Sequence, residues 1–362
     1  MSAKVSFIVA MYNVATYIEQ CARSLFEQTE KDLEFIFVDD ASPDNCTEIV
    51  RRVMGEYPER VPQVKIVRHA ENKKIIETRR DGLSAATGEY VTFIDGDDYV
   101  ETRHAELMYA KAVQSDADCV ICDFFYSSDK DYEAGSIDKD YEAGSIPQDF
   151  IDRGVDLRSA ILNRDLAPYL GSKLVRRTVL TDNDIVWGKG SYGEDVVFSA
   201  MEAFYSKKVE CVNVPLHHYR YNPNSISNQI DEQRLVRNHV EYSGNVQIIE
   251  DFFRSKGCVD QFAKGLYISK VNVRNYLLPL VGKKKYRRMW MKSFPETNKA
   301  IFWGDKSHKS TYRDKIWYLG VTLGFYPRFR KILIKKIFRP GPEWEFGIFR
   351  LDALYKNSLK KV

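Results

Sequence analysis

The chain has 362 residues, of which 44% are hydrophobic, and a formal net charge of +3. This length can bury a large core and predicts one large domain with a smaller one. No segment reaches the roughly 18 uncharged apolar residues of a membrane span, and residues 1–11 lack the features of a signal peptide, so we expect a cytoplasmic protein. Residues 262–362 contain 24 Lys and Arg against 6 Asp and Glu, whereas residues 1–261 contain 30 against 45, which predicts two surfaces with different partners.

Strand and helix patterns alternate through the first hundred residues. Short apolar strands are predicted at 5–10, 33–38, 64–68 and 90–94, with helices between them at 15–28, 47–57 and 75–87. Such alternation with short loops indicates right-handed βαβ units. The predicted fold class is therefore α/β, with a Rossmann-like, mostly parallel sheet and flanking helices.

The later segments are less regular. A helix is predicted at 102–116, a strand at 119–126, mainly helical structure at 151–180, a helix at 196–205 and a strand at 209–214. The nine residues 129–137 are repeated unchanged at 138–146, which indicates a duplication in a surface loop. From residue 231 onward the pattern is helical, so we predict domains at 1–230 and 231–362.

Polar residues follow each of the four predicted strands. Tyr12, Asp39 and Asn72 follow the first three, and the sequence Asp-Gly-Asp-Asp at 95–98 follows the fourth. The carboxyl ends of parallel strands form the ligand-binding edge of an open sheet. Clustered carboxylates repel one another unless a cation lies between them, and oxygen ligands suit Mn²⁺ or Mg²⁺. The alternative is an acidic turn that caps a helix near residue 99.

A nucleotide would fit this edge. Tyr12 can stack on a base, Asp39 can accept a base N–H, Asp95 can bind ribose hydroxyls, and Asp97 can hold a metal on the diphosphate. No G-x-G-x-x-G sequence follows the first strand and no G-x-x-x-x-G-K-[ST] sequence occurs, which argues against a dinucleotide oxidoreductase and a P-loop NTPase. A metal and a nucleoside diphosphate without a P-loop indicate a diphosphate leaving group, as in sugar transfer.

The chain resembles the family 2 glycosyltransferases of the GT-A fold, of the bacterial type that builds surface glycans. The matching stretches are 5–13, 35–44, 71–82, 86–100, 193–197 and 216–227. The resemblance implies transfer of a sugar from a nucleotide donor, often UDP-linked, with inversion at the anomeric carbon. It implies uracil contacts at Tyr12 and Asp39, a diphosphate-side arginine at Arg79, a metal pair at Asp95 and Asp97, a general base at Asp195 beside Glu194, and a diphosphate closure by Arg220 and Ser225.

Some positions depart from the family pattern. Lys73-Lys74-Ile75-Ile76 stands where many relatives have a glycine-rich stretch, and Arg80 stands where many have Asn. These changes bear on the identity of the donor more than on the reaction. His217 or His218 can be a third metal ligand, but a structural or acceptor-side histidine is the favoured interpretation.

We therefore predict a metal-dependent transfer of a hexose or N-acetylhexosamine from a UDP-sugar to a growing surface glycan, such as a lipid-linked oligosaccharide, capsule or lipooligosaccharide. The alternatives are a non-catalytic sugar-nucleotide or glycan-binding protein and a sugar-phosphate nucleotidyltransferase, although residues 10–13 lack the glycine-rich loop of the latter. Basic clusters occur at 283–288 and 328–339. The second is amphipathic and favours an anionic membrane surface, which would be the inner face of the cytoplasmic membrane; the alternative is a solvated C-terminal helix packed on the domain. No nucleic-acid module is recognised, so no nucleic-acid partner is predicted.

Overall fold

The computed structural model describes residues 3–127, 143–144, 146–166, 169–220, 222 and 231–324. The chain divides into two compact units. The first comprises Met1–Ser191 and Phe198–Asn222, and the second comprises Tyr192–Val197 and Pro223–Val362.

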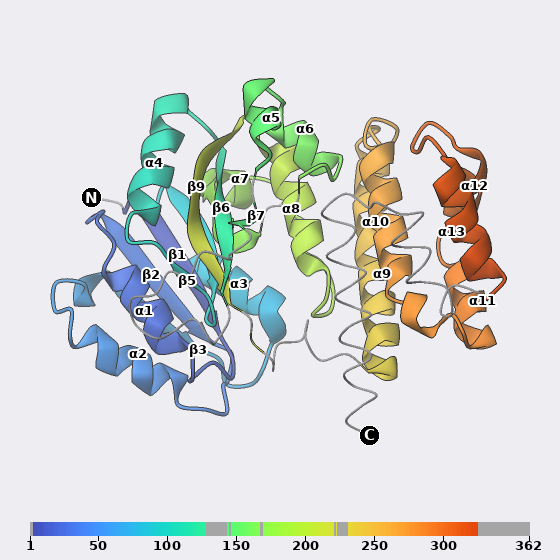
Figure 1. The fold of residues 1–362 in the computed structure, drawn as a ribbon. Helices are drawn as coiled ribbons and strands as arrows, with labels where there is room; N and C mark the ends of the chain where they lie inside the picture. The colour runs from blue at the N-terminus through green and yellow to red at the C-terminus, as the bar shows by residue number, and fades with distance from the viewer. Residues whose placement is uncertain are drawn as a thin grey trace. The chain divides into compact units, whose positions relative to one another are not determined.

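The first unit is built on a 9-stranded mixed sheet (Figure 1). Its strands are β1 Val5–Met11, β2 Leu33–Asp39, β3 Val64–Arg68, β4 Tyr90–Asp95, β5 Tyr99–Val100, β6 Cys119–Ser127, β7 Ala143–Gly144, β8 Lys173–Arg176 and β9 Val209–Arg220. Their order is β3-β2-β1-β4-β8-β6-β9-β5, and β7 pairs with β6. The first four strands are mutually parallel, as the sequence predicts, and β9 runs parallel to β6. The short strands β5, β7 and β8 pair in the antiparallel sense.

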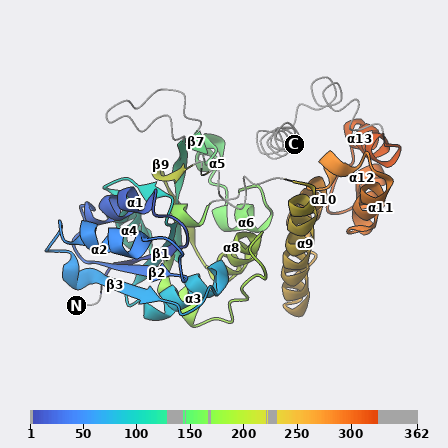
Figure 2. The same cartoon turned by 90° about the horizontal axis from the view of Figure 1, so that it is seen from below.

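Helices cover both faces of the parallel strands. The helices α1 Ile18–Phe26, α2 Cys46–Met54 and α4 His104–Ser115 pack on the face to which Phe7, Val9 and Phe35 point. Alternate residues point the other way, and α3 Lys74–Ala85 lies there against Ile8 and Val38. Figure 2 shows α1, α2 and α4 on one side of the strands and α3 on the other. Apolar residues on both faces explain why these strands are continuous apolar runs.

The prediction of mainly helical structure at 151–180 is wrong for part of that range. The segment contains α6 Leu157–Leu162, the 3₁₀ turn Leu170–Ser172 and α7 Arg177–Thr181, but Lys173–Arg176 forms β8 between β4 and β6. The ammonium of Lys173 is buried and lies 2.9 Å from Glu202 Oε2 and 2.9 Å from Ser199 Oγ. Tertiary pairing therefore overrides the local pattern. The predicted strand at 209–214 also continues to Arg220, which places its end beside the loop after β4.

The second unit is helical in the part of the chain that the structure describes. It contains α9 Glu232–Ser255, α10 Ala263–Asn275, the 3₁₀ turn Leu278–Leu280, α11 Lys284–Lys292, α12 Glu296–Trp303 and α13 Tyr312–Thr322. Trp290 and Trp317 pack edge to face in its core, and the guanidinium of Arg274 lies 3.6 Å from the Trp290 ring centroid. Among the described residues, no helix combines the length and apolar character that crossing a bilayer requires. The predicted basic segment 328–339 lies outside the described residues.

Two short elements complete the first unit, the 3₁₀ turn Val61–Gln63 and the helix α5 Gln148–Asp152. The helix α8 Glu194–Tyr205 begins in the second unit and continues into the first. Most of the duplicated loop 129–146 lies outside the described residues.

Candidate functional site

The acidic loop begins where β4 ends, at the carboxyl edge of the parallel strands. Asp95 pairs in register with Ala10 of β1, and Met11 pairs with Asp39 of β2, so the predicted strand-end residues come from adjacent strands. A Cβ on Gly96 would lie 2.8 Å from the carbonyl oxygen of Ala10, and the Gly96 amide donates to that same oxygen. Glycine at 96 therefore lets the acidic loop pass directly over the end of β1.

Asp95 is paired with an arginine from α3. Nη2 of Arg79 lies 2.9 Å from Oδ1 of Asp95, and the Arg79 side chain is buried whereas that of Asp95 is 44% exposed. The ion pair neutralises one carboxylate of the loop and leaves part of Asp95 open to solvent. The structure therefore brings together two residues that the sequence predicts for the diphosphate end of a nucleotide.

Asp97 is a partly buried carboxylate of the loop. Its Oδ2 accepts a hydrogen bond of 2.9 Å from Nδ2 of Asn222. Burial, then the neighbouring charges of Asp98 and Asp95, raise the pKa of Asp97 from 3.8 to about 7. A divalent cation at this carboxylate would relieve the repulsion, so Asp97 and the exposed side of Asp95 fit the predicted Mn²⁺ or Mg²⁺.

The described residues contain no group of three or more His, Cys, Asp or Glu side chains arranged to hold a metal ion. A Mg²⁺ or Mn²⁺ ion commonly uses one or two carboxylates together with substrate phosphates and water. The donor set of the loop fits this kind of site, in which the substrate completes the coordination shell.

Asp98 has a different task from its two neighbours. Its Oδ2 lies 2.9 Å from Nε2 of His217, and its Oδ1 accepts the backbone N–H of Arg220 at 2.9 Å. Burial raises the pKa of Asp98, although its bond to His217 opposes the shift. Asp98 thus connects the end of β9 to the acidic loop, and His217 is one of its two partners on that strand. The sequence pattern alone indicates no partner for Asp98.

Arg220 lies between two aromatic rings. Its guanidinium carbon is 5.2 Å from the ring centroid of Tyr17 and 5.1 Å from that of Tyr99. Its Nη2 is buried and has no hydrogen-bond partner among the described residues. Two residues earlier on the same strand, the His218 ring stacks on that of Tyr99 at 4.1 Å between ring centroids, and its Nε2 lies 2.7 Å from Oε1 of Glu101. The rings hold Arg220 in place while one of its donors remains available.

The predicted base contacts differ in exposure. Tyr12 is 51% exposed, as a stacking platform requires, whereas Asp39 is buried. Oδ1 of Asp39 accepts the Ser42 amide at 2.7 Å, and Oδ2 accepts the Thr47 hydroxyl at 2.7 Å and lies 3.3 Å from Nε of Arg68. Asp39 therefore orders the loop between β2 and α2 in addition to any role toward a base.

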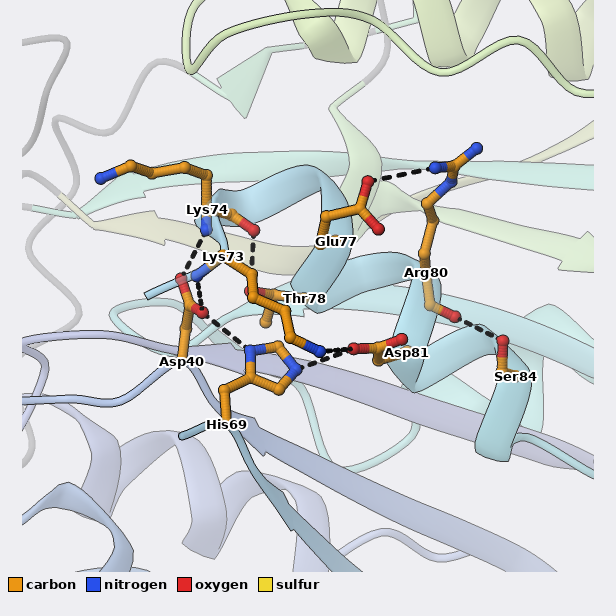
Figure 3. Close-up of polar contacts among 9 residues, drawn as sticks. All are labelled: Asp40, His69, Lys73, Lys74, Glu77, Thr78, Arg80, Asp81 and Ser84. Atoms are coloured by element: carbon orange, nitrogen blue, oxygen red, sulfur yellow. Dashed lines mark hydrogen bonds and ion pairs between the residues drawn. The ribbon is translucent and has the colours of Figure 1, made fainter. Parts of the chain in front are cut away.

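A polar network missed by the sequence analysis fixes the start of α3 (Figure 3). The carboxylate of Asp40 accepts the backbone amides of Lys73 at 2.7 Å and Lys74 at 2.9 Å, so it caps this helix from another loop. His69 bridges Asp40 at 2.8 Å and Asp81 at 2.9 Å. Lys74 has a left-handed φ of 73°, a conformation that glycine adopts more easily. The feature of the sequence that could have indicated this cap is Asp40, the second aspartate of the pair at the end of β2.

Four other predicted residues lie away from the acidic loop or outside the described residues. The amide oxygen of Asn72 is buried without a hydrogen-bond partner among the described residues. Glu194 and Asp195 form the first turn of α8 within the second unit, where Asp195 is exposed and its Oδ1 accepts the Val196 amide at 2.9 Å. Ser225 lies outside the described residues.

Comparison with known proteins gives concordant findings. Residues 6–165 match the family model described as glycosyl transferase family 2. The glycosyltransferase EpsH of Bacillus subtilis is 30% identical over 251 residues, which are 68% of this chain and 69% of that protein. The glycosyltransferase EpsJ of the same organism is 31% identical over 231 residues, 62% of each chain.

Two solved structures share the fold at low identity. TarS of S. aureus, crystallised with UDP-GlcNAc, matches with a TM-score of 0.55 and 17% identity over 99% of this chain and 92% of that one. A mannosyltransferase of Pyrobaculum calidifontis, in complex with GDP-Man and Mn²⁺, matches with a TM-score of 0.51 and 16% identity over 100% and 88% of the two chains. At these identities the likeness concerns the fold alone.

Proposed function

Because this chain belongs to glycosyl transferase family 2, and is therefore a glycosyltransferase, we propose that it transfers a hexose or N-acetylhexosamine from a UDP-sugar, with inversion, to a growing bacterial surface glycan. The observation that carries the donor side of this proposal is the position of Asp97. It is a partly buried carboxylate with a raised pKa, at the ligand-binding edge of the sheet, beside two other carboxylates.

On the donor side, Asp95 and Asp97 would hold Mn²⁺ or Mg²⁺, which would supply positive charge to the diphosphate. Arg79, already paired with Asp95, lowers the negative charge of the loop that the diphosphate must approach. Arg220 offers its buried Nη2 donor to a phosphate oxygen. Together these groups stabilise the charge that grows on UDP as its bond to the sugar breaks.

On the acceptor side, Asp195 acts as the general base. Its carboxylate takes the proton of the acceptor hydroxyl while the hydroxyl oxygen bonds the anomeric carbon and UDP departs from the opposite face. Asp195 is exposed in the first turn of α8, so an acceptor hydroxyl can reach it. Its preference over Glu194 comes from the family resemblance.

The donor and acceptor classes have different support. TarS was crystallised with UDP-GlcNAc and the Pyrobaculum enzyme with GDP-Man, which supports a nucleotide-sugar donor and leaves the base to be tested. The names of the relatives support a glycan acceptor in general terms. We keep as predictions a lipid-linked glycan acceptor and a site of action at the inner face of the cytoplasmic membrane.

The test is a panel of nucleotide sugars, scored by thermal unfolding with Mn²⁺ and again with EDTA. We expect one UDP-sugar to raise the unfolding temperature with Mn²⁺ and not with EDTA, because a ligand that binds only the folded state stabilises it. A shift with a GDP- or CMP-sugar alone would contradict the UDP assignment. No shift with any donor would instead favour a non-catalytic protein, which UDP release with donor, metal and acceptor would then check.

A further inference from the structure

Tyr192 and Gly193, the two residues before Glu194 and Asp195, pack against α9 and α10 and so hold the start of α8 within the second unit. We call the contacts of Tyr192 and Gly193 with these helices the lock. The hydroxyl of Tyr192 lies 2.5 Å from that of Tyr276 in α10. The carbonyl oxygen of Tyr192 accepts a hydrogen bond of 2.9 Å from Nδ2 of Asn245 in α9. Both the side chain and the backbone of Tyr192 are thus held by this helical unit.

Gly193 lets the chain pass close to the ring of Tyr242. Its φ is 76°, and a Cβ at this position would lie 2.6 Å from Cδ2 of the Tyr242 ring in α9. The Tyr192 and Tyr242 rings lie 6.4 Å apart at 67°, and Tyr276 packs edge-on against Tyr192 at 5.2 Å. No other residue fits between the aromatic cluster and Glu194 without moving one of them, because both the backbone conformation and the space require glycine.

The lock is also chemically stable in the neutral range. Burial, together with Tyr192, Tyr242 and the charge of Asp195, raises the pKa of Tyr276 well above its ordinary value. The Tyr276 hydroxyl therefore keeps its proton and can pair with that of Tyr192.

We propose that Tyr192, Gly193 and Tyr276 are positioning residues that fix the Asp195 carboxylate for proton transfer, so that the helical unit contributes to catalysis. This inference rests on the proposed role of Asp195 as the base. A general base must lie within hydrogen-bond reach of the proton that it removes, and a displacement of about 1 Å can cost on the order of 100-fold in rate.

The test compares Gly193→Ala and Tyr276→Phe with the wild-type chain under saturating acceptor. Tyr276→Phe keeps the ring and removes the hydroxyl pair, whereas Gly193→Ala pushes Tyr242 away. We expect each to lower kcat by at least about ten-fold while the KM for the donor and the stabilisation by UDP with Mn²⁺ stay within about two-fold. Removing the obstructing ring, in Gly193→Ala with Tyr242→Ala, restores part of the lost kcat.

Gly257→Ala is the matched control, because Gly257 has a similar φ of 69° in the same unit but no atom within 4 Å of the added Cβ. It should cost stability and leave kcat unchanged. Asp195→Asn separates the two proposals. If Asp195→Asn abolishes transfer but Gly193→Ala and Tyr276→Phe turn over like the wild type, the lock is refuted and the base assignment stands. If Asp195→Asn remains active, the base assignment fails and the lock fails with it.

Discussion

Replacing Asp97 with Asn should make the metal-free protein more stable and should remove its stabilisation by Mn²⁺ with UDP. The carboxylate is partly buried beside Asp95 and Asp98, and its pKa is raised from 3.8 to about 7. A raised carboxylate pKa means that the folded state holds its proton more tightly than the unfolded state. Stability therefore falls as the pH rises from about 4 to about 7, and the full cost of the buried charge applies above that range.

The size of this cost follows from the shift. A change from 3.8 to about 7 is about three units, and each unit corresponds to about 1.4 kcal/mol. Asp97→Asn should thus raise the free energy of unfolding by up to about 4 kcal/mol at pH 8 in EDTA, and by much less near pH 5. The carboxamide oxygen still accepts the hydrogen bond from Asn222, so the change removes charge and keeps the contact.

Urea unfolding at pH 5 and pH 8 measures the effect, with EDTA or with Mn²⁺ and UDP. Mn²⁺ with UDP should stabilise the wild type and not the Asp97→Asn variant. Asp123→Asn is a matched control, since burial also raises the pKa of Asp123 and its Oδ1 accepts one amide, that of Ile146, at 2.6 Å. It should gain stability at pH 8 while its response to Mn²⁺ stays wild-type. An Asp97→Asn variant that is no more stable at pH 8, or that still responds to Mn²⁺ like the wild type, would refute the reasoning.

Three further predictions test neighbouring parts of the site. Lys74→Gly should raise the free energy of unfolding by about 0.5–1 kcal/mol in urea, because glycine adopts its left-handed φ without strain; a loss of stability would contradict this. His217→Gln should lower stability by roughly 1–3 kcal/mol, since it weakens the bond to the buried Asp98, and thermal unfolding at wild-type temperature would rule out that role. Asp195→Asn should fold and bind UDP with Mn²⁺ but lose about 10²–10⁴-fold in transfer rate, whereas Glu194→Gln keeps most of it; near-wild-type turnover by Asp195→Asn would exclude it as the base.

The parallel half of the sheet could be predicted from the sequence because its signals are local. Each strand from β1 to β4 is a continuous apolar run followed by a helix with its own periodicity, so neighbouring residues carry the information. The strand β8 could not be predicted in this way. Its four residues form a strand because they lie between β4 and β6, and that pairing depends on residues far away in the chain.

The same distinction applies to the site. The rule that ligands bind at the carboxyl ends of parallel strands predicts that the acidic loop, Tyr12 and Asp39 lie at the ends of adjacent strands, as they do in the structure. The rule could not predict the different roles of the three carboxylates, because their partners lie far away in the sequence. Asp98 meets His217 across 119 residues, and Asp97 meets Asn222 across 125. The cap of α3 by Asp40 was missed for the same reason.

The partners of the three carboxylates explain why Asp97 is the residue to test first. Asp95 faces the cation of Arg79, and Asp98 faces His217 and the Arg220 amide. Among the described contacts of Asp97, the side-chain donor is the neutral amide of Asn222, which carries no charge to balance that of the carboxylate. The loop therefore places its uncompensated negative charge at the second Asp of the Asp-Gly-Asp-Asp sequence. A divalent cation at this carboxylate would balance that charge, so removal of the charge in Asp97→Asn should remove the stabilisation by Mn²⁺ with UDP.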